Sequence, residues 1–324
     1  MYITDSAYNE KQGRDGMIFG ILTGLTAATL MSVSYVFSKQ FMLRHASPFL
    51  LTLFSQIVQG LCGAAVLICI HGKYDYALIS DGALHWRHIA RVVFPATVGI
   101  LGNFAFFRTL KLLEASRLSS LLGLKIIMLG LICCVFRDER LSFLQWLGIF
   151  LATVAAVGMN FTGGRITLKA GFWLFLTLLG YALGDIAAAD IILDMSGGHI
   201  TIWHAFASTS LPAVLQGLFM IPFLLLKRVP KDLRTFADSA PYGVCWFASL
   251  LFLYPCFGIL GVIFGTIMQS ARGVISVLIG ALLLKFGLEQ YEPRVGTSAW
   301  IRRFFMALLM VGAMAVYAAA KAGI

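Results

Sequence analysis

The chain has 324 residues, of which 59% are hydrophobic and only 12% are charged, and its formal net charge is +10. Soluble proteins average roughly 45–50% apolar and about 25% charged residues, so a water-soluble fold of this length is excluded. A bilayer accepts helices that are apolar on every face, and the composition therefore predicts an all-α integral membrane protein. The basic residues lie singly or in small groups between apolar runs, so no nucleic-acid partner is expected.

Transmembrane helices are expected wherever about 20 apolar residues follow one another, because that length crosses the hydrocarbon core. After a polar N-terminal segment, residues 1–16, ten windows qualify. They are residues 17–38, 48–70, 90–110, 115–136, 142–161, 170–192, 200–226, 242–258, 261–286 and 302–320. The joints are short, and even the two longest, 71–89 and 227–241, could not hold a separate catalytic domain.

The windows form two sets of five, in residues 17–161 and 170–324. In each set the third and fourth windows are joined by a very short turn, near Leu113–Ser116 and near Gly258–Gly261. Five is an odd number of crossings, so two repeats of five helices must sit inverted relative to each other. The pattern predicts ten transmembrane helices in two inverted five-helix repeats, an arrangement typical of secondary transporters with a site near the midplane.

The orientation follows from the Lys and Arg residues of the joints. With both termini on one side, that side carries eight of the 25 Lys and Arg residues and the other side carries fifteen. The positive-inside rule then places the richer side in the cytoplasm and both termini outside. We expect a multi-pass protein of the plasma (inner) membrane.

The stretch from Asn103 to Asn160 carries a series of short motifs. They are Phe104-Ala105-Phe106-Phe107, Ala115-Ser116, Ser119-Ser120-Leu121-Leu122, Asp138-Glu139-Arg140-Leu141-Ser142 and Gln145-Trp146-Leu147-Gly148. This stretch resembles the EamA half-repeat of the drug/metabolite transporter superfamily, and the second half is similar more loosely, over 276–283 and 307–312. The resemblance implies a ten-helix carrier whose fourth and ninth helices line a central cavity. It leaves the substrate open among amino acids, sugars, nucleotide sugars, cations and sugar phosphates.

Two basic residues mark where the sequence departs from that family. Members usually have a proline shortly after the Ser-x-x-Ser-Leu-Leu run, whereas Lys125 stands there, and Arg272 holds the matching place when the halves are superposed. An intramembrane cation costs roughly 3 kcal/mol on insertion scales and normally faces a cavity or a partner. Gln269, Arg272 and Ser276 share one helical face. Two cations at one midplane cavity suit an anionic substrate, since arginine grips carboxylate or phosphate with two hydrogen bonds.

The resemblance supports this interpretation, since members that carry phosphorylated sugars also place basic residues in helices four and nine. Two other interpretations stay open. Either side chain could extend toward the membrane surface, or it could neutralise a buried carboxylate for stability alone.

The sixth window offers Tyr181 and Asp185 on one face, together with Thr177. Asp185 is a counter-ion for Arg272 or Lys125, or alternatively a carboxylate that couples transport to protons. Asp190 falls about 140° away around the same helix, so the two aspartates are not expected to face one cavity.

Hydroxyl and amide groups supply weaker candidates. Ser34 and Tyr35 could contact a substrate, and the resemblance implies that the first helix lines the cavity, but such residues also form hydrogen bonds between membrane helices. The remaining candidates of this kind are Asn103, Gln56, Gln59 and the lone His204.

No catalytic or cofactor motif is present: the sequence has neither a Walker-type phosphate loop nor a His-Glu-x-x-His zinc helix. We therefore expect no enzyme activity, cofactor or metal. The sequence predicts a secondary transporter that works by alternating access on an anionic or zwitterionic metabolite, with phosphorylated compounds included. A proton or a counter-substrate would drive it. The alternatives are an exporter of neutral or amphipathic metabolites such as amino acids, and a non-transporting lipid-interaction or scaffold protein.

Overall fold

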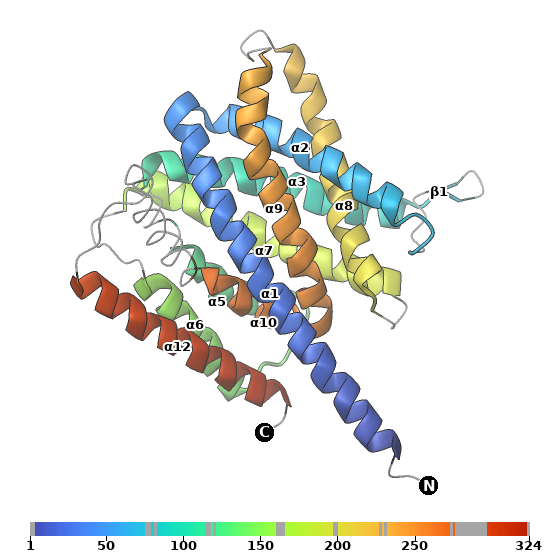
Figure 1. The fold of residues 1–324 in the computed structure, drawn as a ribbon, viewed down its shortest axis with the longest axis vertical. Coiled ribbons are helices and arrows are strands. Elements are labelled where there is room, and N and C mark those ends of the chain that lie inside the picture. The colour runs from blue at the N-terminus through green and yellow to red at the C-terminus, as the bar shows by residue number, and fades with distance from the viewer. Residues whose placement is uncertain are drawn as a thin grey trace.

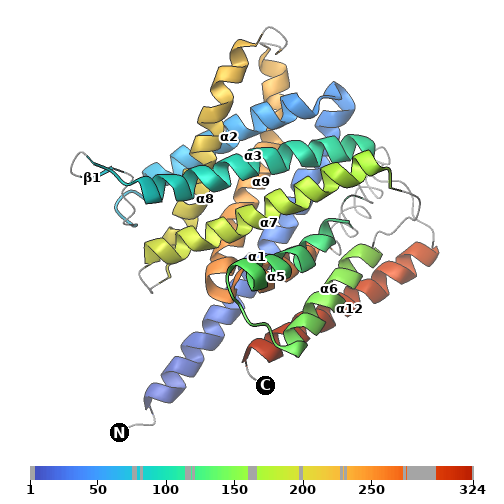
Figure 2. The same ribbon diagram turned by 180° about the vertical axis from the view of Figure 1, so that it is seen from behind.

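The computed structural model describes residues 4–74, 79–80, 83–113, 118, 121–159, 166–196, 200–226, 229, 232–272, 275 and 297–322. These residues are almost entirely helical (Figures 1 and 2). The α-helices are α1 (Thr4–His45), α2 (Pro48–Cys69), α3 (Trp86–Leu112), α5 (Lys125–Phe136), α6 (Phe143–Met159), α7 (Leu168–Ser196), α8 (Ile202–Met220), α9 (Leu233–Leu260), α10 (Val262–Ser270) and α12 (Thr297–Ala322). Two 3₁₀ turns, η1 (Leu122–Leu124) and η2 (Ile221–Leu225), precede α5 and follow α8. A small hairpin pairs β1 (Ile79–Ser80) with β2 (Ala83–Leu84).

Each predicted window contains a helix. Within the described residues, seven helices are long and apolar enough to cross a membrane, and the segments 122–136 and 143–159 are shorter apolar helices. The window 261–286 begins with α10, and its remainder from residue 276 lies outside the described residues. The chain is thus a multi-pass membrane protein built from helices.

Two helices extend beyond their predicted windows. Helix α1 begins at Thr4 and runs unbroken to His45, and the part of it apolar enough to span a membrane, Gly16–His45, begins one residue before the first window. Likewise α9 begins at Leu233 and not at residue 242. In both places polar residues continue the helix beyond the apolar window. A hydropathy window detects only the part of a helix that crosses the hydrocarbon core, so it does not report where the helix begins.

Local sequence accounts for several helix ends. At the start of α2 the Ser47 hydroxyl accepts a hydrogen bond from the amide of Leu50 at 3.3 Å, and Pro48 occupies the first turn, where no amide donor is needed. Between α9 and α10 the backbone turns at Gly261, whose φ of +83° is a conformation that other residues rarely adopt. The Lys321 ammonium, at the end of α12, donates to the main-chain carbonyl of Leu260 at this turn.

The helices pack in pairs. Helix α1 lies along α9 and α3 lies along α7, while α2 packs against α8 and α6 against α12 (Figures 1 and 2). In the α2–α8 pair a Cβ atom on Gly60 would lie only 2.9 Å from the Cα atom of Gly217. Small residues of this kind let two backbones touch, which is how helices associate where no water drives them together.

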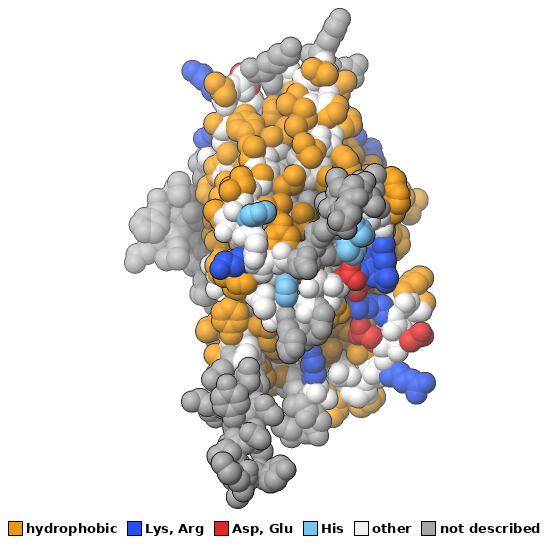
Figure 3. Space-filling model, turned by 90° about the vertical axis from the view of Figure 1, so that its right-hand side faces the viewer, with side chains coloured by type: hydrophobic (Ala, Val, Ile, Leu, Met, Phe, Trp, Pro, Cys, Tyr) orange, Lys and Arg blue, Asp and Glu red, His pale blue; other side chains and the backbone are white. Residues whose placement is uncertain are grey.

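Large apolar side chains cover much of the face that Figure 3 shows, and acidic and basic side chains lie together toward its lower right. Phe136, Phe143 and Ile68 are each more than three-quarters exposed, which suits contact with lipid. Inside, one apolar core forms around α5, α6, α10 and α12, and a second forms around Phe107 and Tyr242. Leu250 packs against both cores, and it also lines a polar cavity.

Candidate functional site

The central cavity is lined by residues from α1, α2, α3, α5, α7, α8, α9 and α10, and from the turns beside α5 and α10. Its lining residues are Met31, Gln59, Pro95, Gly99, Asn103, Leu122, Lys125, Gly180, Tyr181, Gly184, Asp185, Ser208, Thr209, Pro212, Ala213, Gln216, Trp246, Leu250, Tyr254, Gln269 and Arg272. Its volume is about 70 Å³. That is room for a few water molecules, whereas metabolite sites occupy roughly 300–1,000 Å³. As the described residues line it, the cavity is therefore too small for a metabolite.

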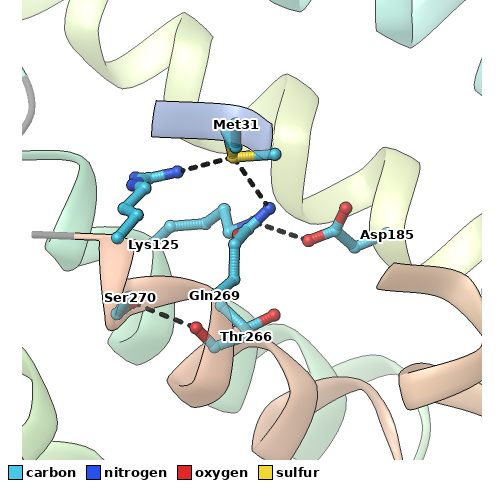
Figure 4. A network of polar contacts seen from close by, with 7 residues as sticks. Met31, Lys125, Asp185, Thr266, Gln269 and Ser270 are labelled. Carbon is cyan, nitrogen blue, oxygen red and sulfur yellow. Dashed lines mark hydrogen bonds and ion pairs between the residues drawn. The ribbon is translucent and has the colours of Figure 1, made fainter. Parts of the chain in front are cut away.

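A buried ion pair joins three helices in the cavity (Figure 4). The Lys125 ammonium, at the first residue of α5, lies 2.6 Å from the Asp185 carboxylate on α7. It also donates to the side-chain carbonyl of Gln269 on α10 at 2.7 Å. The Lys125 and Asp185 side chains are only 5% and 9% exposed, so the two charges balance each other away from water.

Arg272, two residues after the end of α10, is the second buried cation lining the cavity, and it is 6% exposed. Its guanidinium donates to the sulfur of Met31 at 3.2 Å and lies 5.6 Å from the centre of the Tyr35 ring, so both partners are neutral groups of α1. The main-chain carbonyl of Arg272 accepts from the Ser32 hydroxyl at 3.3 Å.

Among the described residues, no carboxylate lies within ion-pair distance of Arg272. The charged residues that line the cavity are Lys125, Asp185 and Arg272. With all three ionised, the described part of the cavity carries one excess positive charge.

Tyr181 and Trp246 form an aromatic wall of the cavity beside these charges, with ring centres 5.8 Å apart. Outside the lining, Tyr35 stacks on Phe106 with ring centres 5.4 Å apart. The Tyr181 hydroxyl donates to the Asn103 side-chain carbonyl at 3.0 Å, which ties α7 to α3. The wall can receive a flat or apolar part of a ligand, and the cations can receive an anionic part.

The predicted site residues divide into three groups. Those that line the cavity are Lys125, Asp185, Tyr181, Asn103, Gln269 and Arg272. Tyr35 packs under Arg272, and the Ser34 hydroxyl donates to the Met31 carbonyl at 2.7 Å, so neither residue lines the cavity in this structure. Ser276 lies outside the described residues.

Of the weaker candidates, Gln59 lines the cavity, and Gln56 is buried elsewhere in α2. His204 completes a capping box with Thr201 at the start of α8. Sequence reasoning missed Trp246, Tyr254 and Gln216, which also line the cavity.

Two clusters of charged residues outside the cavity lie at helix ends. Asp238 on α9 binds Arg44 at 2.6 Å and His45 at 2.9 Å, both near the end of α1. The corresponding cluster at the start of α3 and the end of α7 joins Arg91 and His88 to Asp194.

Asp190 pairs with Arg137 at 2.8 Å and lines a separate groove of about 970 Å³ between α3, α5 and α7. It therefore faces away from the cavity that Asp185 lines, as its position on the helix predicts. Within the described residues, no group of three His, Cys, Asp or Glu side chains could hold a metal ion.

Comparisons with known proteins agree on the class. Residues 18–161 match the model of the EamA-like transporter family. Over 142 residues the chain is 26% identical to CMP-sialic acid transporter 1 of Arabidopsis thaliana, and this alignment spans 44% of the chain and 40% of that relative's length. A crystal structure of another protein superposes with a TM-score of 0.62 at 16% identity, covering 92% of this chain and 95% of that one, and this likeness shows the fold alone.

Over residues 18–161 the chain is therefore similar to EamA-like transporters, and this likeness points to transport.

Proposed function

We propose that the protein is a secondary active transporter that moves a small anionic metabolite across the membrane by alternating access, with Lys125 and Arg272 as the groups that bind the anion. The observation that carries this proposal is the excess positive charge of the described cavity. Removing an ion from water costs several kcal/mol or more unless an opposite charge accompanies it. An anion supplied by the substrate meets this need in the loaded carrier.

The type of cation favours carboxylate or phosphate as the bound group. Arg272 presents a planar fork of donors that matches two oxygens of either group. In this structure its partners are a methionine sulfur and an aromatic ring, which are weaker acceptors than an anionic oxygen. A ligand anion can therefore replace the sulfur contact without breaking an ion pair of Arg272 in the described part of the chain.

The helix pairing supports an inverted repeat of residues 17–161 and 170–324. If the first five helices are exchanged with the second five, α1 takes the place of α7 and α9 takes the place of α3. The α1–α9 pair then corresponds to the α3–α7 pair, while α2–α8 and α6–α12 each correspond to themselves. In this proposal ten helices span the membrane, and the two repeats rock around the cavity to open it to one side and then the other.

Among anions, nucleotide-linked sugars are the first class to test. The aromatic wall of Tyr181 and Trp246 offers a stacking surface for a base, and the Arg272 guanidinium, which lines the same cavity, offers a partner for phosphate. The Arabidopsis relative is named for such a compound, CMP-sialic acid. We place the protein in the plasma membrane with the side richer in Lys and Arg in the cytoplasm.

Thermal stabilisation of the purified protein tests the anion site. The panel contains sugar phosphates, nucleotides, nucleotide sugars, carboxylates, amino acids and amines, because a ligand stabilises the state that it binds. Anions are expected to raise the melting temperature of the wild type and of the control variant Arg137→Gln. Arg137 lines the separate groove between α3, α5 and α7, which we call the outer groove, and not the central cavity. Arg272→Gln should lose that response. Stabilisation only by neutral or cationic compounds, unchanged in Arg272→Gln, would overturn the proposal and favour an exporter of neutral metabolites.

A further inference from the structure

The ammonium group of Lys125 is already engaged before any ligand enters. It binds the Asp185 carboxylate at 2.6 Å and the Gln269 carbonyl at 2.7 Å. An anion that reaches Lys125 must therefore displace Asp185 or share the ammonium with it. In both cases two negative groups come within a few ångströms of each other in a cavity that holds little water. Like charges so placed repel each other, and a proton on one of them relieves the repulsion.

Asp185 is the group placed to accept a proton there. The polar groups of the cavity around it are Lys125 on α5, Gln269 and Arg272 on and after α10, Tyr254 on α9 and Tyr181 on its own helix. The cations already carry their protons, and an amide or a neutral tyrosine does not take one up near neutral pH. Among the described residues that line the cavity, Asp185 is the one carboxylate.

We propose that Asp185 binds one proton whenever an anion occupies Lys125, so that the carrier moves the anion and the proton together in one direction. The inference rests on the proposed function. A proton from water on the open side forms an O–H bond with the Asp185 carboxylate, and the hydrogen bond of Lys125 passes to an oxygen of the anion. When the anion leaves on the other side, the proton returns to water and the Lys125–Asp185 pair forms again.

The charge of the cavity explains why this coupling suits the site. The empty cavity carries two cations and one carboxylate, a net charge of +1. A monoanion that entered alone would bring this to zero, whereas a monoanion with a proton leaves it at +1. For a monoanion the empty and loaded carriers then present the same charge to the membrane interior, whereas CMP-sialic acid, a dianion, with one proton brings the loaded cavity to zero.

The pH dependence of anion affinity tests the proposal directly. The probes are CMP-sialic acid and glucose 6-sulfate, whose own charges stay fixed between about pH 5.5 and about pH 8.5. In the wild type the dissociation constant should rise about tenfold per pH unit over part of this range, because one proton binds with each anion. The Asp185→Asn variant should bind with an affinity independent of pH. Asp190→Asn, on the same helix but in the outer groove, should keep the wild-type slope.

Asp185→Asn leaves Lys125 without its carboxylate and could fail to fold for that reason. A second variant without the unpaired charge keeps the test of the proton coupling possible. The double variant Lys125→Gln/Asp185→Asn removes both charges and should bind more weakly through Arg272, again with no pH dependence. In liposomes, an inward proton gradient should drive accumulation of CMP-sialic acid by the wild type. Asp185→Asn should lose that accumulation while still exchanging labelled for unlabelled compound.

The outcomes separate the two proposals. Binding of either probe with the same affinity across the pH range in the wild type overturns the proton coupling and leaves the anion site intact. A pH slope that persists in Asp185→Asn also overturns it, since another group then takes the proton. If neither probe nor any other anion of the panel stabilises the protein at any pH, the anion site fails and the coupling fails with it.

Discussion

The protein holds two kinds of ion pair with the same spacing and different surroundings. Lys125 and Asp185 lie 2.6 Å apart, and so do Arg44 and Asp238. The central pair is less than 10% exposed, whereas the Arg44 side chain is 53% exposed and Asp238 is 27% exposed. Distance alone therefore does not show what a pair does, because the difference lies in how much water each charge has lost.

Burying the central pair costs free energy. Burying two charges costs several kcal/mol each, and replacing such a pair by apolar residues is often neutral or stabilising. Exposed pairs contribute only about 0–1 kcal/mol and hold helix ends in register. Stability alone does not account for a pair that is this costly to bury. Transport does, because a carrier needs charges that can change partners.

Breaking the central pair should have the largest effect on stability. Asp185→Ala leaves a buried ammonium without its carboxylate and is expected to lower the free energy of unfolding by about 3–5 kcal/mol. The double variant Lys125→Met/Asp185→Ala should regain most of this loss, because no unpaired charge remains. Chemical or thermal denaturation in detergent measures both, with Asp190→Ala as the control. A double variant no more stable than Asp185→Ala would show that the pair itself is what stabilises the fold.

Arg272 should separate binding from stability. Because no carboxylate pairs with it among the described residues, Arg272→Gln leaves no buried charge without its partner and should not lower the unfolding free energy. It should abolish the stabilisation by anions, which reaches about 2.7 kcal/mol when the anion is at 100 times its dissociation constant. Arg272→Lys keeps the charge but not the planar fork, and should retain part of the response. Strong destabilisation by Arg272→Gln with anion binding intact would make the residue structural.

The cluster around Asp238 should have the smallest effect. Asp238→Asn is expected to cost less than about 1 kcal/mol at low salt, and the difference from wild type should shrink near 1 M salt, because exposed charges are screened. The cost of Asp185→Asn should hardly respond to salt, since its pair is buried. Unfolding at two salt concentrations measures both variants. Equal salt sensitivity of the two would mean that water reaches the central pair, and the contrast drawn above would fail.

Much of the fold could be predicted from the sequence because the bilayer imposes a length on each apolar window. The ends of α1 and α9 could not, since the polar residues there continue a helix beyond the apolar run. The pairing of the helices, α1 with α9 and α3 with α7, depends on side-chain shape across segments far apart in the chain, and hydropathy carries no information on it.

The charged part of the site could also be predicted, because Lys125, Asp185 and Arg272 are rare residue types inside apolar windows. The sequence does not predict which of the two cations pairs with Asp185, because this depends on the rotation of α5 and α10 about their axes. Trp246 and Tyr254 could not be identified as cavity residues from the sequence. The chain has 42 Phe, Tyr and Trp residues, and their pattern does not distinguish a cavity wall from a lipid-facing surface.

The turn at Gly261 matters for reading any library of substitutions in this protein. Its backbone, with φ +83° and ψ 158°, is open to glycine and strained for every other residue, and an added Cβ atom would lie 3.1 Å from the Lys321 nitrogen. Variants at this position will score as inactive in a selection for transport although Gly261 does not line the central cavity. Recording the amount of protein in the membrane alongside growth distinguishes such a folding defect from a true loss of cargo recognition.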